Sequence, residues 1–177
     1  PHDGSQAIEQ AIEHLHTLRP NDFALVLPAG NGFDAGCHAS AVAAPGGSVE
    51  FIVDVRADDP THSFIELWSA AAADADFWAL SPDGVRLDAS LPRLEDESGR
   101  LLAELLTPRR SGDSRAQVLL CMKPVVMSDG AVNAALPGRW RLLASNAAAA
   151  QQAVRFDAWI ERDEVVRFAE VIDEDRR

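Results

Sequence analysis

Phe23-Ala-Leu-Val-Leu-Pro-Ala-Gly-Asn31 is the stretch on which the predicted fold of this chain depends. Its first five residues, 23–27, are all apolar, and an unbroken apolar run predicts a strand buried on both faces. Residues 28–30 end this strand, and small residues at the carboxyl end of a buried strand allow a ligand to approach closely. Asn31 follows at that edge, where its side-chain amide can donate a hydrogen bond to a developing oxyanion.

An amphipathic helix is predicted before this strand. Apolar residues recur there at helical spacing, and Ser5 is a suitable N-cap. The sequence Arg-Pro-Asn-Asp at residues 19–22 breaks the pattern and turns the chain into the strand. The apolar positions of the helix are Ile8, Ala11, Ile12, Leu15 and Leu18. The N-terminal segment is therefore predicted as helix, turn, buried strand and a loop that carries Asn31.

Composition excludes several classes of protein. The chain has 177 residues, of which 47% are apolar, so it can bury a substantial core. Lys and Arg number 16 against 28 Asp and Glu, a formal charge of −12, which argues against a nucleic-acid partner. The longest apolar runs fall short of the ~20 residues that a membrane span needs. Because the chain begins with Pro1, we interpret it as a piece of a longer protein.

The cysteines and acidic residues predict no metal site and no cofactor. Cys37 and Cys121 lie far apart and neither belongs to a Cys-x-x-Cys pair, so two free thiols are predicted. His38 follows Cys37, but neighbouring residues rarely point the same way, and no catalytic pair is predicted. Acidic residues could supply oxygen ligands for calcium, although none has a recognised ligand spacing. They are Asp58, Asp59, Asp74, Asp76, Asp163 and Glu164.

From residue 48 onward the apolar pattern has a period of two, which predicts strands with one buried face. Residues 32–47 before it read as a loop with at most one short strand, at 41–44, and residues 161–177 after it read as a charged linker or a frayed helix. The first two strands are predicted to form a hairpin, and residues 100–106 fit either a strand or a helical turn. Besides this segment, the predicted strands span residues 48–56, 63–68, 75–80, 85–89, 116–122, 139–144 and 153–160, of which the first two form the hairpin. Short strands with frequent turns predict an antiparallel β-sandwich.

The N-terminal segment resembles a subtilase, a serine peptidase of the subtilisin-like fold. The resemblance consists of a short loop at residues 1–5, an amphipathic helix, an apolar strand and Ala-Gly-Asn at residues 29–31. It implies that Asn31 is the oxyanion donor and that Ala29 and Gly30 line the pocket for the substrate side chain. A plainer interpretation stays open, because Gly30, Asn31 and Gly32 also suit an ordinary turn.

The sandwich resembles the jelly-roll domain that some bacterial subtilases carry between the oxyanion Asn and the catalytic Ser. Residues 137–142 and 156–163 resemble its last two long strands, although such residues specify fold better than chemistry. The predicted fold class is therefore α+β: a partial α/β helix-strand unit followed by an antiparallel, jelly-roll-like sandwich. The expected domains are residues 1–47 of a subtilisin-like catalytic domain, an inserted sandwich at 48–161, and a linker at 162–177 that returns to the catalytic domain.

The motifs that mark the Asp, His and Ser of a subtilase are absent from this sequence. The resemblance thus implies the middle segment of a serine endopeptidase, inactive by itself, with a polypeptide substrate, the rest of the catalytic domain as partner, and a secreted or cell-envelope location. Two alternatives stay open: a pseudopeptidase, and a non-catalytic β-sandwich that binds a glycan or a protein. The four tryptophans all fall in predicted sandwich strands, and core packing explains them better than sugar stacking.

Overall fold

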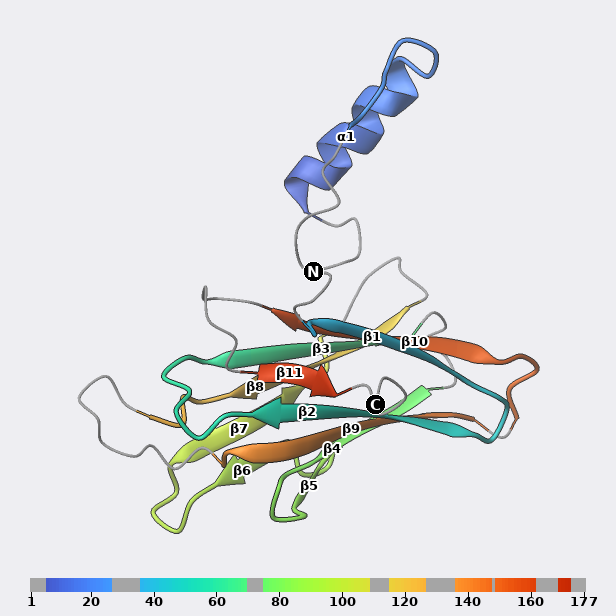
Figure 1. The fold of residues 1–177 in the computed structure, drawn as a ribbon. Helices are drawn as coiled ribbons and strands as arrows, with labels where there is room; N and C mark the ends of the chain where they lie inside the picture. The colour runs from blue at the N-terminus through green and yellow to red at the C-terminus, as the bar shows by residue number, and fades with distance from the viewer. Residues whose placement is uncertain are drawn as a thin grey trace. The chain divides into compact units, whose positions relative to one another are not determined.

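The computed structural model describes residues 6–26, 36–69, 75–108, 115–126, 136–147 and 149–161, and the backbone of residues 169–172 (Figure 1). The chain divides into two compact units, Pro1–Asn31 and Gly32–Arg177. This division follows Asn31, whereas the domain boundary expected from the sequence follows residue 47.

One helix, α1 (Ala7–Leu18), forms most of the described part of the first unit. Its N-cap is Gln6, and the predicted cap, Ser5, lies outside the described residues. The backbone N–H of Gln6 donates to Oε2 of Glu9 at 3.0 Å, which satisfies one of the amide groups left free at a helix start. No helix in the described parts of the chain is long and apolar enough to cross a membrane.

The strand predicted at residues 23–27 is not present in the residues that the structure describes. Residues 23–26 have no regular secondary structure, and Leu25 and Val26 are 47% and 91% exposed. A buried strand needs neighbouring strands to pair with its backbone N–H and C=O groups, and residues 23–26 pair with none of the described strands. The predicted α/β helix-strand unit is therefore wrong, and so is the α+β fold class that includes it.

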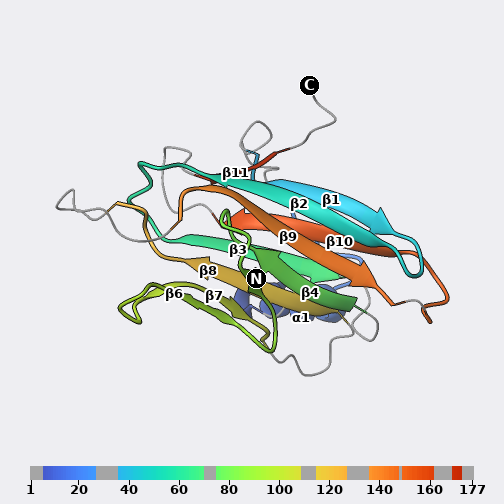
Figure 2. The same cartoon turned by 90° about the horizontal axis from the view of Figure 1, so that it is seen from below.

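Two antiparallel sheets form the second unit (Figures 1 and 2). The first sheet has six strands in the order β1-β10-β3-β8-β7-β6, and the second has five in the order β11-β2-β9-β4-β5. The strands are β1 (His38–Ala43), β2 (Ser48–Val55), β3 (Ser63–Ser69), β4 (Ala75–Leu80), β5 (Arg86–Leu87), β6 (Arg93–Glu95), β7 (Leu101–Leu106), β8 (Ala116–Met122), β9 (Gly138–Asn146), β10 (Val154–Glu161) and β11 (Ala169–Ile172).

The chain passes repeatedly from one sheet to the other. Eight strands follow the orders β1-β10-β3-β8 and β2-β9-β4-β5, which is how an eight-stranded jelly roll is arranged. The other three strands extend it: β7 and β6 lie beyond β8, and β11 lies beside β2. The antiparallel sheets agree with the predicted β-sandwich, and apart from α1 the described secondary structure is all β.

The hydrophobic core lies between the two sheets. Alternate residues of β10 enter it, as their period-two spacing predicted: Val154, Phe156, Ala158 and Ile160. Phe156 has no exposed surface, and its ring meets that of Phe77, from the other sheet, edge to face with centroids 6.1 Å apart. The residues between these positions therefore point to the outer faces of the sandwich.

Three local predictions differ from the structure. The hairpin predicted from β2 and β3 is wrong, since β2 pairs with β9 and β11 whereas β3 pairs with β8 and β10. The turn between them carries the chain from one sheet to the other. The short strand allowed at 41–44 in the predicted loop begins earlier, since β1 spans His38–Ala43. The predicted C-terminal linker contains β11, which pairs with β2. Residues 101–106 form a strand and not a helical turn.

Candidate functional site

The residues that the resemblance assigns to a catalytic site lie outside the described part of the chain. They are Asn31, the expected oxyanion donor, and Ala29 and Gly30, the expected pocket wall. The described residues before them include α1 and the segment 19–26. The role of the three residues therefore stays a prediction. The structure describes the segment that precedes them in the sequence.

Apolar side chains of the first unit are exposed. Ile8, Leu15 and Leu18 lie on α1 with 66%, 48% and 63% of their surface accessible, and no residue of this helix is buried. Their spacing places them on one side of the helix. An apolar helix stripe is ordinarily buried against another layer of protein, so the first unit presents a surface suited to such a layer.

A histidine–aspartate pair lies on the outer face of the first sheet. Nε2 of His38, in β1, is 3.0 Å from Oδ1 of Asp157, in β10, and the same oxygen accepts a hydrogen bond from Arg155 at 2.7 Å. The His38 ring stacks on Trp159 with centroids 3.7 Å apart. No hydroxyl or thiol among the described residues is hydrogen-bonded to His38, so the pair lacks the nucleophile that a catalytic base would activate.

The Cys121 thiol is not activated as a nucleophile. Cys37 and Cys121 are half-buried and form no disulfide. Burial raises the pKa of the Cys121 thiol, the nearby Glu104 carboxylate raises it further, and Lys123 opposes them. A thiol with a raised pKa stays protonated near neutral pH, and a protonated thiol is a poor nucleophile.

The described acidic residues form no metal centre. Both oxygens of Asp58 accept hydrogen bonds from Arg56 at 2.8 Å, and Asp59 accepts from the backbone and hydroxyl of Thr61 and from the hydroxyl of Ser63. Within the described residues, no group of three His, Cys, Asp or Glu side chains is placed to hold a metal ion. Of the other positions considered for calcium, Asp76 is exposed on β4. Asp74, Asp163 and Glu164 lie outside the described residues.

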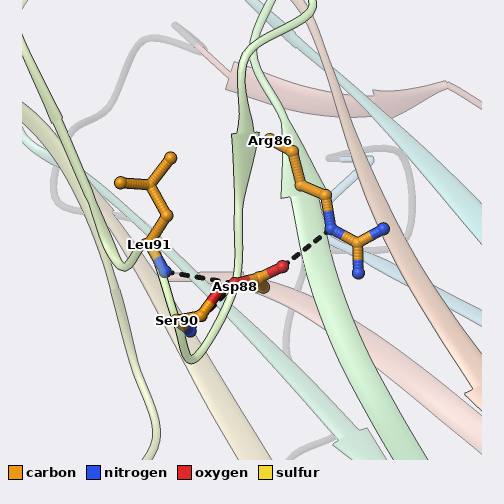
Figure 3. A network of polar contacts seen from close by, with 4 residues as sticks. All are labelled: Arg86, Asp88, Ser90 and Leu91. Carbon is orange, nitrogen blue, oxygen red and sulfur yellow. Dashed lines mark hydrogen bonds and ion pairs between the residues drawn. The ribbon is translucent and has the colours of Figure 1, made fainter.

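Asp88 closes the loop that follows β5 (Figure 3). Its Oδ1 accepts from the backbone N–H and the hydroxyl of Ser90 at 2.9 and 2.6 Å and from the N–H of Leu91 at 3.1 Å. Its Oδ2 accepts from Nε of Arg86 at 2.8 Å. These hydrogen bonds hold the pKa of Asp88 well below its usual range, and the bond from the Ser90 hydroxyl has the largest effect. Both oxygens are engaged within the loop, so this network organises the loop.

The tryptophans do not form a single platform for a sugar. Trp140 and Trp68 are 1% and 5% exposed, which leaves Trp78 and Trp159 partly accessible. Trp78 lies on β4 and Trp159 on β10, at positions that alternate with core residues, so they point to opposite outer faces of the sandwich. Packing accounts for the two buried rings, and the accessible pair cannot stack on one ligand.

A hollow of 230 Å³ on the outer face of the first sheet was not found from the sequence. Side chains from β3, β7, β8 and their adjoining residues line it: His62, Phe64, Leu102, Glu104, Cys121 and Lys123. They occupy alternate positions in three neighbouring strands, and the residues between them are buried: Ser63, Ala103 and Met122. The hollow depends on the strand pairing, which brings three segments far apart in the sequence together.

The sandwich and its preceding unit are similar in structure to part of a protease. The CspB protease of Clostridium perfringens matches with a TM-score of 0.61 and 14% identity, over 97% of this chain and 34% of that chain. This chain thus corresponds to about a third of CspB in length, and at this identity the likeness defines a shared fold. No protein-family model and no curated protein matches the sequence.

A second solved structure is less similar. The propeptide form of the Bacillus licheniformis lipase BlEst2 matches with a TM-score of 0.40 and 10% identity, over 85% of this chain and 26% of that chain. A score this low does not define a common fold. The comparison that defines a fold for this chain is therefore the one with the protease.

Proposed function

We propose that this chain is the middle segment of a subtilisin-like serine endopeptidase with an accessory β-sandwich. The observation that carries the proposal is the structural likeness to a protease over 97% of this chain, which spans 34% of that protease. The order of helix, apolar run and Ala-Gly-Asn before a sandwich supports it from the sequence. The exposed apolar side of α1 also supports it, because the rest of a catalytic domain would cover that side.

Asn31 has the chemistry that the proposed role needs. When a serine attacks a peptide carbonyl, negative charge develops on the carbonyl oxygen, and a neutral side-chain amide can donate a hydrogen bond to it without changing its own protonation. Such a donor contributes about 3–4 kcal/mol to the stability of the transition state relative to the bound substrate. Ala29 and Gly30, with almost no side chain, leave room for a substrate side chain beside it.

The coding sequence on both sides of this segment provides the first test. The proposal expects a catalytic Asp and a His-Gly-Thr-His motif upstream, and a Gly-Thr-Ser motif downstream. Unrelated domains on both sides would contradict it and would favour a binding module. Since the triad motifs are not found in these residues, the purified 177-residue chain should not hydrolyse peptides.

A substitution in the full-length enzyme tests the role of Asn31. Asn31→Ala should lower kcat by about a hundredfold or more with little change in KM, because the lost hydrogen bond is made mainly in the transition state. Asn21→Ala is the matched control, since Asn21 is exposed and lies in the turn after α1. Equal kcat values for the two variants would exclude Asn31 as the oxyanion donor.

A further inference from the structure

The side chains that line the hollow on the first sheet are arranged in rows across its paired strands. Cys121 pairs across the sheet with Phe64 on one side and with Glu104 on the other, so these three side chains form one row (Figure 2 shows β3, β8 and β7 as neighbours). The backbone N–H of Lys123 donates to the carbonyl of Leu102 at 2.9 Å, which places these two residues side by side in the next row. The hollow is therefore built on the framework of the sheet.

Its floor and walls are mostly apolar. Leu102 is 6% exposed and belongs to the hydrophobic core cluster, and Phe64 and Cys121 are half-buried. The ring of His62 lies nearly parallel to that of Phe64, at an angle of 12° with centroids 6.2 Å apart. A volume of 230 Å³ is below the ~300–1,000 Å³ of sites for drug-sized ligands, and it suits one ring or a short branched chain.

Two charged side chains lie at the rim of the hollow, and they differ in whether the structure gives them an ion-pair partner. The Glu104 carboxylate accepts a hydrogen bond from Nε of Arg93 at 2.8 Å, so its charge is already paired. Lys123 is the single lysine of the sequence, and no described residue forms a hydrogen bond or ion pair with its ammonium group. Among the described residues, the hollow thus combines an apolar interior with one cation that has no ion-pair partner, in a chain whose net charge is −12.

We propose that this hollow binds a small organic carboxylate whose body is a single apolar ring or a short branched chain. The apolar body lies against Phe64, Leu102 and Cys121, and the carboxylate accepts hydrogen bonds from the Lys123 ammonium group. Because that ammonium group is exposed to solvent, binding is weak, with a dissociation constant in the millimolar range. The site is independent of the peptidase function proposed above.

Benzoate is the probe, and the protein is the 177-residue chain labelled with ¹⁵N. In a titration followed by two-dimensional NMR, benzoate should cause saturable shifts confined to the amides of residues 62–64, 101–104 and 121–123. Benzamide has the same ring without the charge, and should bind about tenfold more weakly because it lacks the charge-assisted hydrogen bond. Equal binding of the two compounds, or benzoate shifts that are absent, unsaturable or located elsewhere, would overturn the proposal.

Two single-charge variants locate the interaction. Lys123→Gln should weaken benzoate binding about tenfold and leave benzamide binding unchanged, since it removes only the cation. Arg56→Gln removes one positive charge from an exposed position outside the hollow, and should leave benzoate binding unchanged. If both variants weaken binding equally, benzoate responds only to the net charge of the protein and the assigned site is wrong.

Discussion

Phe156→Ala tests whether the two sheets form one core. Phe156 has no exposed surface, and its contact with Phe77 joins β10 of the first sheet to β4 of the second. Removing a buried phenylalanine ring costs about 4 kcal/mol through lost transfer free energy and the cavity left behind. About 1 kcal/mol of that loss belongs to the edge-to-face pair. We therefore expect the free energy of unfolding of the chain to fall by about 4 kcal/mol.

Urea unfolding followed by tryptophan fluorescence measures this change, because Trp140 is buried in the same sandwich. Val42→Ala is the control: Val42 lies on β1 and is 64% exposed, so its truncation should cost less than about 0.5 kcal/mol. A double-mutant cycle with Phe77→Ala should give a coupling energy of about 1 kcal/mol. A loss for Phe156→Ala as small as that of the control would refute a shared core between the sheets.

Two further predictions concern carboxylates that organise loops. Asp59 is 1% exposed and accepts three hydrogen bonds from Thr61 and Ser63, so Asp59→Ala should lower the free energy of unfolding by about 2–3 kcal/mol in the same urea assay; an unchanged midpoint would contradict a structural role. The pKa of Asp88 is lowered in the folded chain, chiefly by the Ser90 hydroxyl, so its ionised form stabilises the fold above the usual Asp range, and this stabilisation is lost as the pH falls through the lowered pKa. The stability difference between the chain and Asp88→Asn should thus be largest near neutral pH and shrink below about pH 4; a difference that does not vary with pH would contradict this reasoning.

Strand positions were predicted well because the signal for a half-buried strand is local. Local patterns of apolar residues placed β2, β3, β4, β8, β9 and β10 within two residues of their observed bounds at every end. The turn Ser81–Gly84 was likewise predicted from its own four residues: the Gly84 N–H donates to the Ser81 carbonyl at 2.9 Å, and Gly84 has a φ of +82° that favours glycine. Signals of this kind require no knowledge of distant parts of the chain.

The first segment shows where this reasoning failed. The apolar run at residues 23–27 predicted a buried strand, yet Val26 is 91% exposed and residues 23–26 have no partner strand among the described residues. An apolar run indicates that a segment is suited to burial. It does not indicate whether the strands or helices that would bury it belong to the same chain.

The sequence by itself determined which residues of β2 and β10 face the core, because strand alternation assigns a face to every position of a half-buried strand. The assignment of each strand to a sheet came only from the tertiary structure, as did the pairing of β2 with β9, the contact between His38 and Asp157 across 119 positions, and the hollow around Lys123. These features depend on contacts between residues far apart in the chain. A local sequence pattern constrains which face of the sheet a side chain lies on. The residues that it contacts on that face depend on the packing of the whole domain.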